Sequence, residues 1–81
     1  MQDENKLTPE HIVRKRDAAL AAYDAGDFDA AFLLFLEIAQ EGDTLAQFSL
    51  GLMHENGQAV QQDFDEAREW YMKAARQDLA A

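Results

Sequence analysis

The feature of this sequence that most restricts its fold is an internal repeat. When the chain is shifted by 36 residues, the segment that begins at Gly26 aligns with the segment that begins at Gln62. The positions that agree are Asp27, Phe28 and Asp29 with Asp63, Phe64 and Asp65, Ala31 and Ala39 with Ala67 and Ala75, and the aromatic pair Phe35 and Tyr71. The chain therefore contains two copies of one structural unit.

The second half of the second unit carries the signals of a capped amphipathic helix. Gly57 ends one run of helix formers, and Asp63 opens another with Glu66 three residues later. This is a capping box, in which the Asp63 side chain accepts hydrogen bonds from the first turn and Glu66 reaches back to the N–H of Asp63. The apolar residues of this helix lie at helical spacing on one face. They are Phe64, Ala67, Tyr71, Ala74 and Ala75, with Trp70 beside them.

The first halves of the two units align at a shorter shift of 31 residues, which places Tyr23 on His54 and Gly26 on Gly57. The second unit therefore has additional residues, 58–62, in its internal loop. A two-helix unit repeated with variation in loop length is typical of an α-solenoid, in which each unit buries its apolar face against its neighbour. We predict an all-α fold of two stacked antiparallel hairpins, with four helices, as a fragment of an α-α superhelix.

The first two helices are predicted from their caps. Thr8 caps the first helix, which has Pro9 at its first position and runs to about Ala25. The second helix follows Asp27, runs to about Glu41 and is apolar on almost every side. Such a helix needs cover on several sides, and we expect the first helix and both helices of the second unit to supply it.

The third helix is predicted from its cap, Asp43, to about Asn56. Gly51 in mid-helix costs about 1 kcal/mol relative to alanine, so we expect a close approach of another helix at this residue. The predicted inward stripe consists of Leu45, Phe48 and Leu52, with Leu50 and Met53 close by.

One group of residues in the second unit resembles a known repeat. The group comprises Leu50, Gly51, Leu52, Met53, Gly57, Val60, Asp63, Ala67, Trp70, Tyr71, Lys73, Ala74 and Ala75. It resembles the Sel-one-like repeat, a relative of the tetratricopeptide repeat, over residues 45–78. His54, Ala59 and Asp78 stand where that family usually has Tyr, Gly and Gly. The first unit looks more like a plain tetratricopeptide hairpin. The resemblance implies protein–protein interaction, with the first helix of each hairpin lining a concave side.

The 81 residues are enough for one small domain. We expect residues 1–7 to be disordered because they are polar, and residues 8–81 to form the domain, with units at about 8–42 and 43–79. The start lacks the apolar core of a signal peptide, and no apolar run is long enough to span a membrane, so we expect a cytoplasmic protein. The sequence contains no cysteine for disulfides or thiolate ligands.

The sequence leaves open whether the array ends with the second unit. Arg68, Glu69 and Lys73 replace Phe32, Leu33 and Glu37 in the fourth helix, which favours a polar outer side typical of a terminal unit. In contrast, the last residues, 79–81, are apolar and could begin another unit.

The charge of the chain is strongly negative and unevenly distributed. The formal net charge is −9, and no Lys or Arg lies between Asp17 and Ala67. The resulting potential disfavours nucleic acid and anionic membranes and favours a basic protein or peptide partner. We expect helix-face residues such as Asp17, Gln47 and Glu55 to contact that partner.

No group of residues predicts catalysis or metal binding. Asp27 with Asp29, and Asp63 with Asp65, could be read as paired carboxylates, but both pairs lie at helix starts, where acids are favoured as caps and by the helix dipole. His54 is followed by Glu55 but lacks the second histidine of a zinc-protease helix. We expect Trp70 and Tyr71 to belong to the core, and we predict no cofactor.

These observations favour a non-enzymatic adaptor or scaffold that binds a protein or peptide partner. Two other hypotheses remain open. Two units are fewer than the ~3 that an independent solenoid usually needs, so the chain could form a homodimer or be a piece of a longer repeat array. A small acidic helical protein could also be an inhibitor or immunity protein for a basic partner.

Overall fold

A computed structural model describes residues 8–80, which form four α-helices and contain no strand in that range. The helices are α2 (Glu10–Asp24), α3 (Phe28–Gln40), α4 (Thr44–Asn56) and α5 (Phe64–Ala80). The predicted all-α fold is confirmed. The predicted disorder of residues 1–7 lies outside the described residues. Within residues 8–80, no helix combines the length and the apolar character that crossing a membrane requires.

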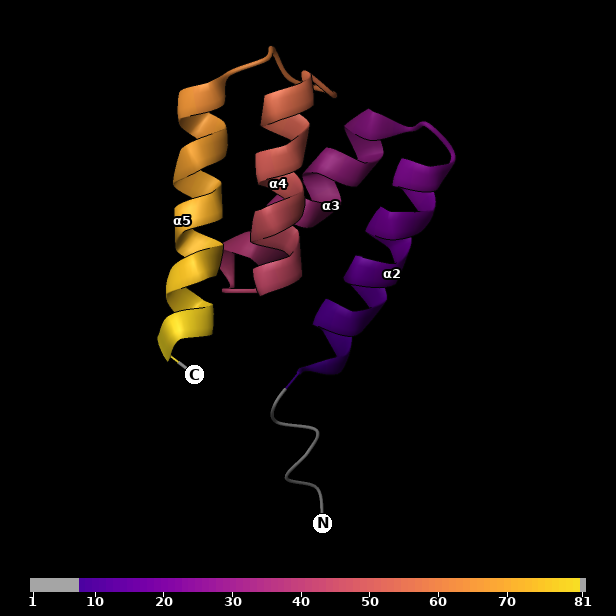
Figure 1. The fold of residues 1–81 in the computed structure, drawn as a ribbon. Coiled ribbons are helices and arrows are strands. Elements are labelled where there is room, and N and C mark those ends of the chain that lie inside the picture. Colours follow the sequence, from indigo (N-terminus) through magenta and orange to yellow (C-terminus); the bar gives the residue numbers. More distant parts are fainter. Residues whose placement is uncertain (1–7, 81) are drawn as a thin grey trace.

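The helices are arranged as two antiparallel hairpins, α2 with α3 and α4 with α5 (Figure 1). The first helices of the two hairpins, α2 and α4, run in the same direction, and both hairpin loops lie at the same end of the molecule (Figure 1). The hairpins are joined by the packing of α3 against α4. This arrangement confirms the stacked pair of hairpins that the repeat predicts.

Aspartates cap three of the four helices. Asp27 accepts from the N–H of Ala30 at 3.3 Å, Asp43 from Ala46 at 2.9 Å, and Asp63 from Glu66 at 3.0 Å. Each cap of this kind contributes about 1 kcal/mol to stability. The predicted return bond from Glu66 is replaced by a backbone bond, because the N–H of Asp63 donates to the carbonyl of His54 at 2.9 Å.

The start of α2 differs by one position from the prediction. The helix begins at Glu10, Pro9 is its N-cap residue, and no side chain caps it. The backbone at Pro9 is extended, with ψ 147°, and the carbonyl of Pro9 accepts from the N–H groups of Ile12 and Val13. Proline therefore stands just before the first turn, where its missing N–H also leaves no bond unmade.

The core lies where α3 and α4 meet, between the two hairpins. Its largest fully buried side chains are Phe35, Ile38, Leu50 and Met53. The expectation that α3 is covered on nearly all sides is only partly correct, because α2 and α4 supply its main cover and Leu33 remains 63% exposed.

The predicted inward stripe of α4 is wrong for two residues. Leu45 and Phe48 are 39% and 48% exposed, whereas Ala46, Leu50 and Met53 are buried. The reason is that α4 is packed between α3 and α5, and the residues at positions 46, 50 and 53 face that interior. Residues 45, 48 and 52 have the same helical spacing, so the period alone does not distinguish the two stripes.

Candidate functional site

An open groove runs between α4 and α5 on the surface of the second hairpin. It has a volume of about 570 Å³. We call it the α4–α5 groove, and its lining residues are Thr44, Leu45, Phe48, Tyr71, Ala74 and Ala75. Apart from Thr44, these side chains are aliphatic or aromatic, so the groove is suited to apolar contact and offers few hydrogen bonds.

The shape of the groove depends on a close contact between its two helices. A Cβ atom on Gly51 would lie 2.5 Å from Cε1 of Tyr71, so only glycine lets the ring come this close to the α4 backbone. The ring of Tyr71 also packs against Phe48, with 5.3 Å between ring centroids. The two aromatic rings therefore lie side by side along the groove.

The hydroxyl of Tyr71 fixes the groove at the end nearer the α4–α5 loop. It donates a hydrogen bond of 2.6 Å to Oε1 of Glu55, in the last turn of α4. Burial, the hydrogen bond to Glu55 and the charge of that carboxylate together raise the pKa of Tyr71 to about 12. Tyr71 is therefore a neutral donor at physiological pH, and the Glu55 carboxylate that accepts its hydrogen bond lies at the loop end of the groove.

The same place in the first unit is filled. At the 36-residue shift, Tyr71, Ala74 and Ala75 correspond to residues 35, 38 and 39 of α3, which are at most 2% exposed. Phe35 lies beside Ser49 and Leu52 of α4. The α5 wall of the α4–α5 groove is thus the counterpart of the α3 surface against which α4 packs in the first unit.

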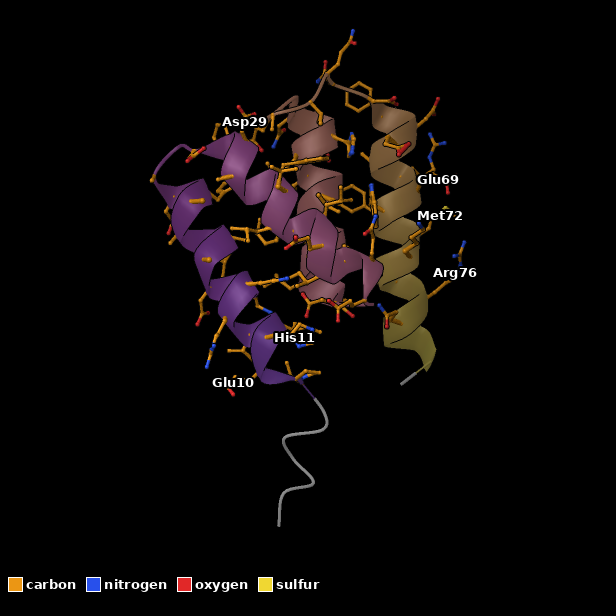
Figure 2. All side chains as sticks on the ribbon, turned by 180° about the vertical axis from the view of Figure 1, so that it is seen from behind. Glu10, His11, Asp29, Glu69, Met72 and Arg76 are labelled. Atoms are coloured by element: carbon orange, nitrogen blue, oxygen red, sulfur yellow. The ribbon has the colours of Figure 1, made fainter. Side chains whose placement is uncertain are left out.

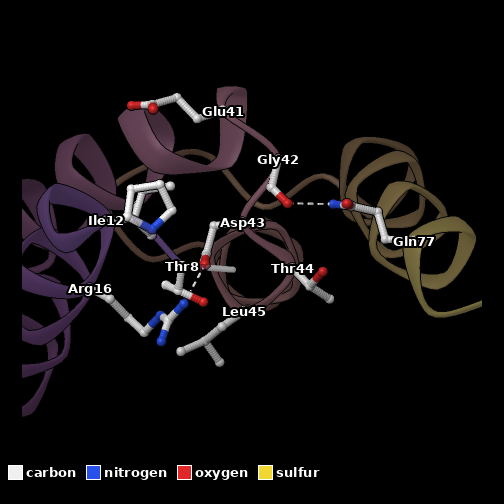
Figure 3. Close-up of a pocket in the computed structure, with 10 residues that line it drawn as sticks. Thr8, Ile12, Arg16, Glu41, Gly42, Asp43, Thr44, Leu45 and Gln77 are labelled. Atoms are coloured by element: carbon white, nitrogen blue, oxygen red, sulfur yellow. Dashed lines mark hydrogen bonds and ion pairs between the residues drawn. The ribbon is translucent and has the colours of Figure 1, made fainter. Parts of the chain in front are cut away.

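A second hollow, of about 470 Å³, lies where the start of α2 meets the turn between α3 and α4 (Figure 3). Its lining residues are Thr8, Pro9, Ile12, Arg16, Glu41, Gly42, Asp43, Thr44, Leu45 and Gln77. Arg16 pairs with Oδ1 of Asp43 at 2.6 Å, while Oδ2 of the same carboxylate caps α4. Gln77 donates to the carbonyl of Gly42 at 2.6 Å (Figure 3). These polar groups join α2, α4 and α5 to one another, so their role is structural.

Of the three predicted contact residues, none lines the α4–α5 groove. Asp17 is exposed on α2, and Glu55 is partly exposed and holds Tyr71. Gln47 is only 6% exposed and donates to the carbonyl of Ala39 at 3.1 Å, while its oxygen accepts from Gln77 at 3.0 Å. The amide of Gln47 is therefore used inside the protein and is not presented to a partner.

The residues of the repeat motif have structural positions. Leu50 is fully buried, Ala67 is 3% exposed, and Trp70 packs against the core with Lys73 4.5 Å above its ring. Gly57 ends α4 in the left-handed conformation with φ 69°. Ala74 is buried at the floor of the groove, whereas Ala75 is exposed at its wall.

The exposed position of Leu45 and Phe48 is the feature that sequence reasoning missed. A signal for it was present in the repeat, because the 31-residue shift places Leu45 on Arg14 and Phe48 on Asp17. Arg14 and Asp17 are exposed on α2. The corresponding face of α4 is therefore an outer face that carries apolar residues where the first unit carries charges.

Charges are separated along the long axis of the hairpins. At the end where α2 begins, cations are paired with acids: Arg14 with Glu10, Lys15 with Glu37, and Arg16 with Asp43. Nε2 of His11 lies 2.7 Å from Oε1 of Glu41 at the same end. The hairpin loops lie at the other end, and Figure 2 shows Asp29 there and Glu10 with His11 at the opposite end. The acids near the loops include Asp24, Asp27, Asp29, Glu55, Asp63, Asp65 and Glu66, and within residues 8–77 the one ion pair among them joins Asp65 to Arg68.

Among residues 8–80, no three His, Asp or Glu side chains converge in a way that would hold a metal ion. The polar side chains described above cap helices, pair with each other or join the two units. The arrangement is therefore suited to binding another molecule through apolar contact.

Comparison with known families identifies the second unit. The model of the Sel1 repeat matches residues 44–79, which span α4, the following loop and most of α5. The resemblance seen in the sequence is therefore confirmed for these residues. Sel1 repeats are non-catalytic and generally mediate protein–protein interaction. Neither the comparison with curated proteins nor the comparison with solved structures gave a match.

Proposed function

We propose that this chain, with its Sel1 repeat at residues 44–79, is a non-catalytic interaction module that binds a protein partner in the α4–α5 groove. The observation that carries the proposal is the exposure of Leu45 and Phe48, 39% and 48%, at the wall of an apolar groove. Apolar residues exposed singly are normal, whereas apolar residues that lie together in an exposed groove mark interaction sites. Here they lie open beside a third apolar side chain, Tyr71.

Burial of this surface contributes favourably to binding. Apolar area removed from water contributes about 25 cal/mol per Å², and aromatic side chains in a preformed pocket are the usual centres of binding energy. Phe48 and Tyr71 form such a centre, and the Tyr71 ring is already fixed by Gly51 and Glu55. A partner therefore binds a surface that is already ordered, so little side-chain entropy of the groove is lost on binding.

The acids near the loops support a partner that is basic. The net charge of the chain is −9, and the end of the groove near Glu55 lies beside the α4–α5 loop, where Asp63 precedes the first-turn acids of α5, Asp65 and Glu66. A negative potential at one end of an apolar groove accelerates encounter with a cationic partner and orients it.

The proposal is tested by comparing partners captured by three forms of the protein. Wild type, Phe48→Glu and Leu33→Glu are each immobilised and exposed to an extract of the cells that produce the protein. Leu33 is the matched control because it is an exposed leucine on α3, outside the groove. We expect wild type and Leu33→Glu to retain the same protein and Phe48→Glu to lose it. Equal retention by all three forms would overturn the proposed site.

Self-association is a second candidate, and one observation favours it. The N-terminal part of α5 is net acidic, with Asp65, Glu66 and Glu69 against Arg68, whereas its later part is net basic, with Lys73 and Arg76 against Asp78. Two copies of α5 packed antiparallel would place opposite charges next to each other. Light scattering of the purified chain over a range of concentrations tests this candidate, because a dimer that resists dilution would support it and a monomer would exclude it.

A further inference from the structure

We infer that the segment which fills the α4–α5 groove is an amphipathic α-helix of a partner protein, parallel to α4, with Lys or Arg in its last turn. The inference rests on the proposed function and adds the conformation, direction and charge of the partner segment. Three observations support it: the repeat within the chain, the apolar chemistry of the groove walls, and the acids at the loop end of the groove.

The repeat shows what kind of segment fits. In the first unit, the surface formed by Phe35 and its neighbours is covered by α4, which lies against it as a helix. The corresponding surface in the second unit is lined by Tyr71, Ala74 and Ala75. Because these α5 positions correspond to the α3 positions that α4 covers, the α5 wall has the side-chain spacing that accepts a helix. The α4 wall, Leu45 and Phe48, is apolar only in the second unit, because the first unit has the exposed residues Arg14 and Asp17 at these positions.

The groove walls disfavour an extended peptide. An extended backbone that faces an apolar wall leaves N–H and C=O groups without partners, and each unsatisfied group is unfavourable. The walls of the groove are helices, whose backbone groups bond to each other, and the hydroxyl of Tyr71 is already donated to Glu55. A helix satisfies its own backbone and presents only side chains to such walls.

The direction of the helix follows from the stacking of the units. Because α2 and α4 run in the same direction (Figure 1), the next helix in the same series runs that way too. Its C-terminal end then lies at the loop end of the groove, near Glu55 and the cap Asp63. The C-terminus of a helix carries a partial negative charge, so cations in the last turn are favoured both by the helix itself and by these acids.

The other end of the groove, where α4 begins, does not require a charged residue on the partner helix. In the first unit, Arg16 of α2 pairs with Asp43, the cap of the helix that fills the surface. The 31-residue shift places Gln47 at the position of Arg16, and Gln47 is buried and bonded to Gln77. No cation therefore stands at this position, and the start of the partner helix needs no acidic cap residue to pair with one.

A second copy of this chain does not supply the required helix by head-to-tail stacking. Its free first helix would be α2, which has no basic residue in its last turn and ends at Asp24. Stacked in the same direction as α4, it would bring Asp24 towards Glu55 and Asp63, and like charges placed together are unfavourable. A cationic amphipathic helix from another protein avoids this cost.

The test is a selection from a displayed library of random 16-residue segments against the full chain, with Phe48→Glu and Leu33→Glu as counter-targets. We expect the segments enriched on wild type and on Leu33→Glu to share apolar residues at i, i+3, i+4 and i+7 and Lys or Arg in the last four positions. The corresponding free peptides should become helical on binding, as measured by circular dichroism. We expect Phe48→Glu to weaken them about tenfold or more, and Glu55→Gln to weaken them about threefold while reducing their preference for the C-terminal cations.

A second groove variant, Ala75→Arg, keeps the test decisive if Phe48→Glu fails to fold, because Ala75 is exposed at the wall and arginine is a good helix former. Enriched segments that are extended or proline-rich, or that have no C-terminal cations, but still depend on Phe48 would overturn this inference and leave the proposed groove intact. The absence of any groove-dependent segment would overturn both. A dilution-resistant dimer that Phe48→Glu converts to a monomer would assign the groove to a second copy and overturn the partner helix.

Discussion

The ring of Tyr71 rests directly on the backbone of Gly51, so closely that a Cβ atom at residue 51 would lie 2.5 Å from Cε1 and 2.6 Å from Cδ1 of the ring. Gly51 is buried in mid-helix, where glycine is otherwise unfavourable. The contact therefore determines both the separation of α4 and α5 and the position of the aromatic wall of the groove.

The first prediction concerns Gly51→Ala. The new methyl group gains about 1 kcal/mol of helix propensity but overpacks the contact with the ring, which costs about 1–3 kcal/mol. We expect the free energy of unfolding to fall by about 1 kcal/mol in urea titrations. In a Tyr71→Ala background the ring is absent, and Gly51→Ala should be neutral or stabilising. Equal effects of Gly51→Ala in both backgrounds would contradict the close approach.

The second prediction concerns pH. The pKa of Tyr71 is raised to about 12 by burial and by Glu55, compared with 10.0 for an unperturbed tyrosine. The native state therefore favours the neutral phenol, and this contribution to stability is complete below pH 10 and is lost as the pH rises towards 12. We expect urea unfolding at pH 8 and pH 11 to show a larger loss for wild type than for Tyr71→Phe.

A direct titration accompanies that measurement. The chain contains two tyrosines, so the difference in tyrosinate absorbance between wild type and Tyr71→Phe reports Tyr71 alone. Glu55→Gln keeps a hydrogen-bond acceptor but removes the charge, and we expect it to lower the pKa of Tyr71 from its wild-type value. A Tyr71 that ionises near pH 10 in the wild-type protein would contradict the observed hydrogen bond and burial.

The third prediction compares two caps with the same local role. Asp43 caps α4 and also pairs with Arg16 at 2.6 Å in a buried setting. Asp27 caps α3 at 3.3 Å and is exposed. Asp43→Ala should therefore cost about 2–4 kcal/mol, since it removes a cap and leaves Arg16 without its partner. Asp27→Ala should cost about 1 kcal/mol or less, and Asp43→Asn, which keeps an acceptor for the cap, should lie between them in thermal or urea unfolding.

The contrast between these caps and the groove explains what could be predicted from the sequence. The caps at Asp27, Asp43 and Asp63 depend on the chain within three residues, so local sequence is enough to find them. The close approach at Gly51 was also predictable, because an unfavourable residue in mid-helix needs a compensating contact. The partner of that contact, Tyr71, was not, since it lies in the next helix.

The candidate site was harder to predict because it depends on which side of α4 is covered. Residues 45, 48 and 52 have the same helical spacing as the stripe that includes Leu50, and the buried stripe is selected by the neighbours α3 and α5. Gln47 was expected to contact a partner as a helix-face residue. It is instead buried, because Gln77 and the carbonyl of Ala39 satisfy its amide.

The last prediction separates the two stripes of α4 by stability. Leu50 is fully buried and Phe48 is 48% exposed. Leu50→Ala should cost about 2–5 kcal/mol, since it leaves a cavity between α3 and α5, whereas Phe48→Ala should cost about 1 kcal/mol or less, because only its contact with Tyr71 is lost. Leu33→Ala is the matched control for an exposed apolar residue outside the groove, and it should change the free energy of unfolding by about 0.5 kcal/mol at most. If Phe48→Ala were as costly as Leu50→Ala in urea titrations, Phe48 would be part of the core, and the α4–α5 groove would not be a free surface. If the variant Phe48→Ala is stable but no longer binds the groove-dependent peptides, then Phe48 contributes to binding and not to folding.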